Sequence, residues 1–115
     1  MVVAALALVG ALAGIGWARA LHRPLRVDYY YIPYCMSCAK VKGALDAWKG
    51  SVAGRVEVRT IDCFSAEGVA AAKKYGFVTH GIVVEKGGEL LFEEKDHGVS
   101  ADDVRVIVAR ELASR

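Results

Sequence analysis

The sequence predicts an α/β domain over residues 25–115, preceded by one N-terminal membrane-spanning helix. Three observations predict this organisation. The chain has 115 residues, which is room for one hydrophobic core and not for two. After residue 24, strand-like and helix-like stretches alternate. Residues 1–18 carry no charged side chain, so all 15 basic and all 13 acidic residues lie in the remaining part of the chain.

The composition excludes several classes of protein. Hydrophobic residues make up 55% of the chain and there are only two prolines, which excludes a disordered or low-complexity protein. Three cysteines are too few for a small fold stapled by disulfides. The net charge of +2 does not provide the basic surface that nucleic-acid binding needs, so we expect no nucleic-acid partner.

Residues 1–18 are long enough to span a membrane. In a helix they extend about 27 Å, close to the hydrocarbon thickness of about 30 Å. We expect residues 1–20 to form an anchor that ends at Trp17 and Arg19, with the membrane as the partner of residues 1–18. A secretory signal is the alternative, because Ala18-Arg19-Ala20 has the small-x-small form of a cleavage site. No basic residue precedes the apolar run, which argues against cleavage and favours an anchor or an uncleaved signal. The absence of a polar face argues against a buried core helix.

The remaining pattern predicts four strands and three helices in the order β-α-β-α-β-β-α. Strand-like stretches are rich in β-branched and aromatic residues or alternate in polarity, and helix-like stretches repeat apolar residues every three or four positions. The expected strands are residues 25–32, 55–61, 82–85 and 89–93. The expected helices are residues 38–49, residues 65–75 and a last helix from residue 100 to about 112. In residues 65–75, Val69 and Ala72 are expected to face the core, and Gly87-Gly88 predicts a hairpin turn between the last two strands.

Two cysteines stand where the first strand ends and the first helix begins, in Cys35-Met36-Ser37-Cys38. Free backbone N–H groups and the positive end of the helix dipole stabilise a thiolate at such a position. Cys38 lies one turn further on, close enough to close a small disulfide. A C-x-x-C motif also occurs in zinc knuckles and metal chaperones, but its position at a strand–helix junction favours redox chemistry. Cys35 and Cys38 are therefore the predicted catalytic residues.

The stretch Pro33-Tyr34-Cys35-Met36-Ser37-Cys38, after an aromatic strand, resembles the active-site stretch of the thioredoxin family. The resemblance continues through residues 58–62, 74–79, 87–88 and 98–100, and covers about residues 25–112. It implies a thioredoxin-like fold and a thiol–disulfide oxidoreductase that exchanges disulfides with protein thiols. In that family the first cysteine attacks a substrate disulfide and the second resolves the mixed disulfide, which gives these roles to Cys35 and Cys38. The resemblance implies no cofactor beyond the redox-active Cys35–Cys38 disulfide.

The sequence departs from the family pattern at two places. The family usually has a cis-proline before its third core strand, where this chain reads Val78-Thr79-His80-Gly81-Ile82. A cis bond without proline costs about 2.5–4 kcal/mol, so we do not expect one between Thr79 and His80. Thioredoxins also have a buried acid six residues before the first cysteine, and that position here is Tyr29. Asp28 falls on the opposite face of the strand, and we interpret it as a strand-start or edge charge rather than a proton relay.

Three further residues are candidate accessory groups. His80 lies at or next to the place of the proline, where an imidazole would stabilise the Cys35 thiolate or act as a base for Cys38; the alternative is an exposed loop histidine. Cys63 follows the second strand and is either a third redox thiol or a small buried hydrophobe. Tyr34 precedes Cys35 and is expected to rim the substrate groove.

Two other function classes remain open at this point. Cys35, Cys38, Cys63 and His80 together make a conceivable Cys₃His zinc set, so a metal-binding or metal-delivery module is the first alternative. The second is a redox-inactive interaction domain on the same scaffold. The side of the membrane is also open: Arg19, Arg23 and Arg26 follow the apolar segment and favour the cytoplasm, whereas analogy with tethered members of the family favours the cell envelope.

Overall fold

A computed structural model describes residues 24–96 and 100–114 of the chain. The anchor or signal predicted for residues 1–20, including Arg19, lies outside the described residues, as does Arg23. Within the described ranges no helix is both long enough and apolar enough to cross a membrane.

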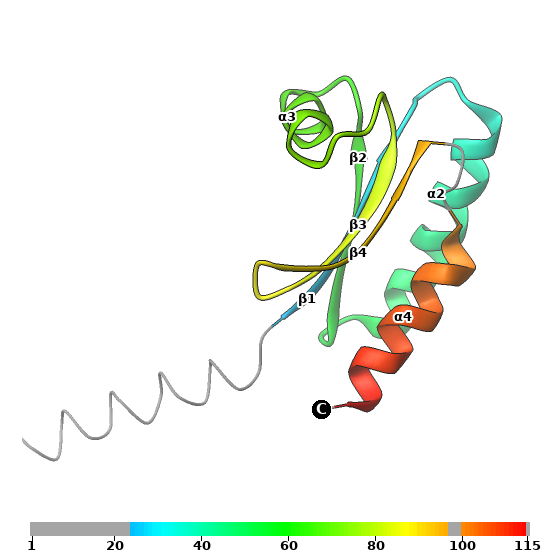
Figure 1. Ribbon diagram of the computed structural model, residues 1–115. Coiled ribbons are helices and arrows are strands. Elements are labelled where there is room, and N and C mark those ends of the chain that lie inside the picture. Colours follow the sequence, from blue (N-terminus) through cyan, green and yellow to red (C-terminus); the bar gives the residue numbers. More distant parts are fainter. Residues whose placement is uncertain (1–23, 97–99, 115) are drawn as a thin grey trace, which may run out of the picture.

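Four strands form one sheet in the described residues, and three α-helices pack on it (Figure 1). The strands are β1 (Leu25–Tyr31), β2 (Val56–Asp62), β3 (Gly81–Lys86) and β4 (Glu89–Lys95). The helices are α2 (Met36–Lys49), α3 (Ala66–Tyr75) and α4 (Ala101–Ala113), and a short 3₁₀ helix, η1 (Gly50–Val52), follows α2. The strand order is β2-β1-β3-β4, with β1 parallel to β2 and the other two pairs antiparallel. The predicted order of elements is confirmed.

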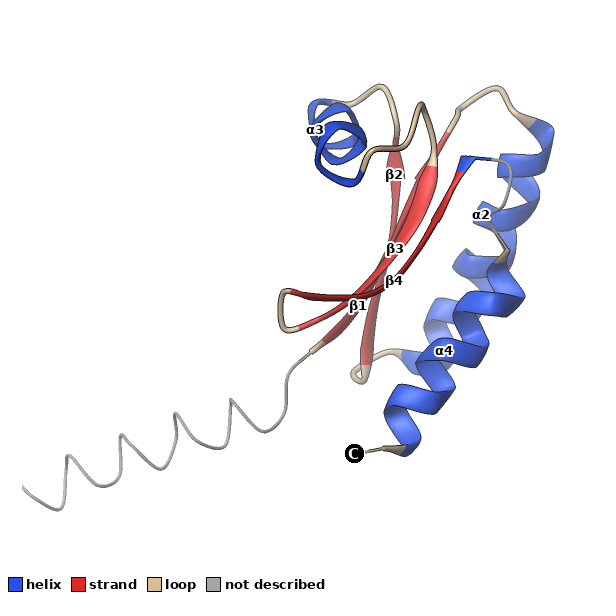
Figure 2. Cartoon of the chain, in the orientation of Figure 1, coloured by secondary structure: helices blue, strands red, loops and turns tan. Residues whose placement is uncertain are grey.

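The sheet is covered unequally on its two faces. Helices α2 and α4 lie side by side on one face, and α3 alone lies on the other (Figure 2). The main core fills the space between the sheet and the α2–α4 pair. It contains fully buried side chains from β1, α2, β3 and α4, namely Leu25, Val27, Tyr29, Leu45, Ile82, Val84, Val104 and Val108. The alternation of β1 places Tyr29 on this face and Asp28 on the other.

The face under α3 is apolar at one end and charged at the other. Tyr30, Ala71, Phe77 and Val83 form a small apolar cluster beneath α3. Beyond it, Asp28 is 2% exposed and accepts two hydrogen bonds from Arg59, at 2.8 and 3.0 Å. The prediction that Asp28 is an edge or strand-start charge is therefore wrong. Because β1 is a central strand, Asp28 is buried, and its charge is balanced by guanidinium groups.

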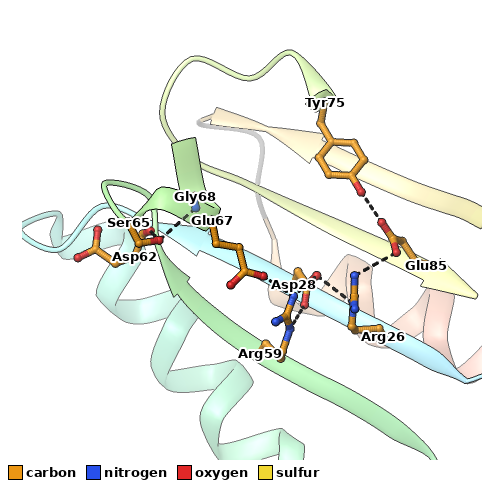
Figure 3. A network of polar contacts seen from close by, with 9 residues as sticks. All are labelled: Arg26, Asp28, Arg59, Asp62, Ser65, Glu67, Gly68, Tyr75 and Glu85. Atoms are coloured by element: carbon orange, nitrogen blue, oxygen red, sulfur yellow. Dashed lines mark hydrogen bonds and ion pairs between the residues drawn. The ribbon is translucent and has the colours of Figure 1, made fainter. Parts of the chain in front are cut away.

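This charged cluster ties α3 to the sheet (Figure 3). Arg59 also donates to Glu67 in the first turn of α3, at 2.8 Å. Arg26 contacts both Asp28, at 3.1 Å, and Glu85, at 3.3 Å. Glu85 in turn accepts a hydrogen bond from the hydroxyl of Tyr75, the last residue of α3. Residues at both ends of α3 are thus hydrogen-bonded to the same network of charged side chains.

The inner face of α3 differs from the one predicted. Val69 is 46% exposed, so the expectation that it faces the core is wrong, while Ala72 packs against the apolar cluster as a partly buried residue. The residues that turn inward are Gly68 and Ala71. A Cβ on Gly68 would come within 2.4 Å of the Asp62 carbonyl oxygen and 2.7 Å of Cys63 Cα. The helix can approach the end of β2 this closely only because residue 68 has no side chain.

The β3–β4 connection is the predicted hairpin. Gly87 and Gly88 both have positive φ, 57° and 87°, which is the conformation that a two-residue turn of this kind requires. The strands it joins pair in antiparallel register from Gly81 opposite Lys95 to Lys86 opposite Glu89, with one irregularity between Val84 and Glu85.

Candidate functional site

Cys35 is the N-cap residue of α2. Its sulfur accepts a hydrogen bond from the backbone N–H of Cys38 at 3.4 Å, so the thiol itself takes the role that Ser, Thr or Asp usually fills. This capping explains why α2 starts at Met36, two residues before the start predicted from the apolar spacing. The side chain of Ser37 lies 3.1 Å from the same sulfur. Cys35 is partly exposed at the end of the sheet where β1 ends.

These donors make Cys35 a more acidic thiol than usual. The Ser37 hydroxyl, the Cys38 side chain and the Cys38 backbone N–H together lower the pKa of Cys35 from 9.0 to about 7. Each of them stabilises the charged form, because a thiolate accepts hydrogen bonds more strongly than a thiol. The lowered pKa raises the share of Cys35 that is thiolate near neutral pH, and a thiolate is the nucleophile in disulfide exchange.

Cys38 is buried one turn further along α2, with 2% of its surface exposed. It belongs to the main core, against which Cys35 also packs. Tyr29, itself 1% exposed, is buried in the same core as Cys38. Burial, followed by the nearby Cys38, Cys35 and Cys63 side chains, raises the pKa of Tyr29. All three cysteines are free thiols in this structure.

Cys63 is brought to the same region from the end of β2. It is buried, and its backbone N–H donates to the Tyr31 carbonyl oxygen at 2.9 Å, which fixes the chain beside the end of β1. Burial raises the pKa of the Cys63 thiol, with smaller contributions from Asp62 and Cys38. This environment keeps Cys63 protonated and is that of a small buried side chain rather than of an activated nucleophile.

His80 is buried in the loop that leads into β3, so it is not an exposed loop histidine. Its Nδ1 lies 3.1 Å from the Thr79 hydroxyl. The peptide bond between Thr79 and His80 is trans, like every other peptide bond in the described residues. The groups that shift the Cys35 pKa most are Ser37 and Cys38, and the role predicted for His80 at the thiolate stays a prediction.

Asp96 holds this loop in place, which the sequence did not reveal. It has a positive φ of 55°, and its carboxylate accepts hydrogen bonds from the backbone N–H groups of Val78, at 3.2 Å, and Thr79, at 3.4 Å. Its own N–H donates to the His80 carbonyl oxygen at 2.9 Å. An Asp just after a strand is a common turn residue, but only the pairing of β3 with β4 brings it to residues 78–80.

Two large apolar side chains next to Cys35 in the sequence are exposed. Tyr34 is 97% exposed and Met36 is 88% exposed, one on each side of Cys35 in the sequence. The place of Tyr34 at the rim of a substrate groove stays a prediction. A groove of about 500 Å³ runs from Cys63 along α3 and is lined on its outer side by Phe64 and Val78, which are also exposed. A second groove of about 620 Å³ lies at the other end of the sheet, far from the cysteines in the fold.

The four side chains proposed as a zinc set do not form one. Among the residues that the structure describes, no group of three or more His, Cys, Asp or Glu side chains is placed to hold a metal ion. Cys35, Cys38 and Cys63 gather at one end of the sheet, but the described geometry does not complete a tetrahedral site with His80.

The arrangement is therefore an N-capping thiol with a lowered pKa and a buried second thiol one turn on. Solved structures with the same fold come from thioredoxins. The fold is thioredoxin-like. Thioredoxin-2 of the malaria parasite superposes with a TM-score of 0.64 and 20% identity over 76% of this chain and 84% of its own. Fasciola hepatica thioredoxin gives a TM-score of 0.63 and 19% identity over 86% and 92% of the two chains.

Other matches support the same fold. A designed protein superposes with a TM-score of 0.60 and 25% identity, over 79% of this chain and 78% of its own. No protein-family model matches the chain, and no curated protein matches it. At these identities the likeness of the thioredoxin structures to this chain is a likeness of fold, and the activity has to be argued from the site itself.

Proposed function

We propose that this chain is a thiol–disulfide oxidoreductase that exchanges disulfides with protein thiols through Cys35 and Cys38. The observation that carries the proposal is the capping position of Cys35, whose hydrogen bonds from Ser37 and Cys38 lower its pKa to about 7. The thioredoxin-like fold of the matched structures supports it. The reaction needs no cofactor other than the Cys35–Cys38 disulfide.

The two cysteines divide the reaction between them. The Cys35 thiolate attacks one sulfur of a substrate disulfide and releases the other sulfur as a thiolate, which leaves a mixed disulfide on Cys35. Cys38 then attacks the Cys35 sulfur, which forms the Cys35–Cys38 disulfide and releases the second substrate thiol. Partial exposure suits Cys35 for the first step, and burial of Cys38 keeps it for the second.

The direct test is reduction of insulin disulfides by the full-length chain with dithiothreitol as the electron source. We expect insulin to precipitate faster than with dithiothreitol alone, and Cys35→Ser to abolish the difference. Cys38→Ser is expected to stop turnover with substrate trapped on Cys35. An intact chain without activity would favour a redox-inactive interaction domain, and stoichiometric zinc in inactive protein purified under reducing conditions would favour a metal-binding module.

The roles of His80, Tyr34 and Cys63 are part of this proposal. If the His80 imidazole supports the Cys35 thiolate, His80→Ala raises the Cys35 pKa and slows alkylation near neutral pH, while an unchanged pH profile removes His80 from the site. Tyr34→Ala is expected to weaken substrate binding without changing the Cys35 pKa. Cys63→Ser tests the third thiol, because a redox role predicts altered turnover with insulin.

We also propose that residues 1–18 tether the domain to a membrane as a single-pass anchor. The absence of charge over these residues supports the proposal. The test is whether the expressed chain stays with membranes after alkaline carbonate extraction and loses this association when residues 1–20 are removed. Labelling of Cys35 in intact cells by a membrane-impermeant maleimide would place the domain on the outer side, and protection from it would place the domain in the cytoplasm.

A further inference from the structure

One edge of the sheet is open along its whole length in the described residues. β2 pairs with β1 on one side, and the strand order places it at the end of the sheet. The groove of about 620 Å³ lies beside its first half, where Val56 and Val58 form part of the lining. An open strand edge presents backbone N–H and C=O groups to which a further strand can bond.

The opposite edge is of a different kind. The pairing of β4 with β3 is irregular between Val84 and Glu85, and three of the seven residues of β4 are acidic, namely Glu89, Glu93 and Glu94. Irregular pairing and charge are common means by which an edge strand is kept from pairing with another chain. β2 instead keeps an unbroken register with β1 over all seven residues and carries charges of both signs.

The backbone of β2 determines which groups face outward. The N–H of Cys63, directly after the strand, donates to the Tyr31 carbonyl oxygen at the end of β1. Successive residues of a strand direct their N–H and C=O groups to opposite sides, so the odd-numbered residues of β2 bond to β1. The N–H and C=O groups that point away from the sheet are therefore those of Val56, Val58 and Thr60.

A second copy of β2 matches these groups in one antiparallel register. With the two copies of Val58 opposite each other, Val56 of each copy lies opposite Thr60 of the other. Every outward N–H then meets an outward carbonyl oxygen of the other strand. A two-fold axis through Val58 generates this register, as a symmetric dimer requires. A shift by two residues would leave Val56 or Thr60 without a partner from the set.

The charged side chains select the same register independently. It places Glu57 of each copy directly opposite Arg59 of the other, and opposite charges at such positions stabilise a strand pair. Glu57 is exposed and has no ion-pair partner among the described residues. Arg59 bonds to Asp28 and Glu67 through Nε and Nη2, which leaves Nη1 without a described partner (Figure 3).

We propose that β2 is a self-association edge, through which two copies of this chain pair antiparallel about Val58 and join their sheets into one. The occupant is a second copy because the strand is complementary to itself in both backbone and charge. No cysteine lies within the paired residues 56–60, and the proposal is independent of the proposed function.

Disulfide trapping tests the register. The parent is the full-length chain in detergent micelles, without its native cysteines (Cys35→Ser, Cys38→Ser and Cys63→Ala). One cysteine is then introduced, as Val58→Cys or as Thr60→Cys. Opposite residues that exchange hydrogen bonds have Cα atoms about 5.5 Å apart, within the range of about 4.4–6.8 Å that a disulfide requires.

We expect Val58→Cys to form a disulfide-linked dimer under mild oxidation. Thr60→Cys is the control and should stay monomeric, because the two copies of residue 60 lie four residues out of register. Equal cross-linking at both positions would show contact without this register and would overturn the proposal. Absence of cross-linking at position 58, as when residues 1–23 of the same chain cover the edge, would also overturn it.

A charge reversal tests the same pairing in the chain with its native cysteines, kept reduced. Glu57→Arg removes no described ion pair but places an arginine opposite each Arg59. We expect the dissociation constant of the dimer, measured by sedimentation equilibrium in micelles, to rise about tenfold, because two attractive cross-strand pairs become repulsive. Thermal unfolding shows that the variant remains folded.

Glu93→Arg is the matched control, because it makes the same change of charge on the other edge strand. It should leave the dissociation constant of the dimer unchanged. Equal effects of the two reversals, or a parent that is monomeric at every concentration, would contradict the proposal. Failure of the proposed function would look different, since it would appear in the insulin assay and leave the dissociation constant as it is.

Discussion

The reactivity of Cys35 depends on hydrogen-bond donors of Ser37 and Cys38, within its own tetrapeptide. The Ser37 hydroxyl is the largest cause of the lowered Cys35 pKa and lies 3.1 Å from the sulfur. We expect Ser37→Ala to raise the Cys35 pKa, because a donor to the thiolate is lost, and to lower the alkylation rate at pH 7 about threefold. The rate of iodoacetamide alkylation against pH measures both. Ser51→Ala is the control, since Ser51 bonds to the Trp48 carbonyl oxygen at the far end of α2; an equal shift in both variants would contradict this assignment.

At the residue scale, the sequence predicts the roles of residues that depend on their local position, and it does not predict contacts that depend on which strands and helices lie next to each other. Cys35 and Cys38 follow from spacing and from the strand–helix junction. The local pattern does not predict that Asp28 is buried, because nothing local shows that β1 is a central strand, with β2 on one side and β3 on the other. The burial of Tyr29 and Cys38 in one core also depends on how α2 packs against β1, although alternation along the strand does place Tyr29 on the correct face.

Helix α3 is the element whose position depends most on a single backbone contact. Gly68→Ala would force a Cβ to within 2.4 Å of the Asp62 carbonyl oxygen. We expect it to destabilise the fold by about 1–3 kcal/mol, even though alanine is the better helix former. Gly43→Ala in α2 is the matched control, since no atom lies within 4 Å of the added methyl group, and it should stabilise by about 0.5–1 kcal/mol. Urea unfolding of both variants tests the contrast, and a stabilised Gly68→Ala would show that α3 does not lie this close to β2.

The charged cluster that holds α3 supplies a second prediction for this element. Arg59→Ala removes both hydrogen bonds to the buried Asp28 and the bond to Glu67. Because Arg26 still faces Asp28, we expect a loss of about 2 kcal/mol in the free energy of unfolding rather than the full cost of an unpaired buried charge. Arg55→Ala, which loses only an exposed bond to the Ser51 carbonyl oxygen, should change stability little. Equal urea midpoints for the two variants would be incompatible with a stabilising cluster.

The same element shows why its inner face could not be predicted. Apolar spacing over residues 65–75 favours Val69 as the inward residue, but the helix approaches β2 so closely that only Gly68 and Ala71 fit there. A glycine inside a helix is usually a weak position, and only the approach of the two backbones explains it. Element order and type were predictable because strong local periodicity determines them.

The free energy of unfolding of the whole molecule should depend on pH through Glu94. Burial raises the pKa of Glu94, and Asp103 raises it further, where β4 meets the start of α4. A carboxyl group whose pKa is higher in the folded than in the unfolded protein binds its proton more tightly when the protein is folded. It therefore stabilises the fold at pH values below its unfolded pKa of about 4.5. This stabilisation is lost as the pH rises through the folded pKa. We therefore expect Glu94→Gln to gain stability relative to the parent between pH 4 and pH 7 in urea unfolding.

Glu93→Gln is the control for this experiment, because Glu93 is on the same strand with its side chain on the other face. Relative to the parent, the free energy of unfolding of Glu93→Gln should not rise between pH 4 and pH 7 as that of Glu94→Gln does. If Glu94→Gln instead loses stability relative to the parent as the pH rises, the fold favours the Glu94 carboxylate and lowers its pKa rather than raising it.

Redox titration of the Cys35–Cys38 pair tests the central claim about the whole molecule most directly. The full-length chain is equilibrated in glutathione buffers of increasing oxidation, quenched by alkylation and weighed by mass spectrometry. A redox pair predicts loss of two hydrogens along a two-electron curve, in which a tenfold change in the ratio of oxidised to reduced protein takes about 30 mV, and Cys35→Ser should abolish it. A pair that stays reduced at every potential, a glutathione adduct that never resolves, or a disulfide that joins Cys63 in place of Cys35 would contradict the claim.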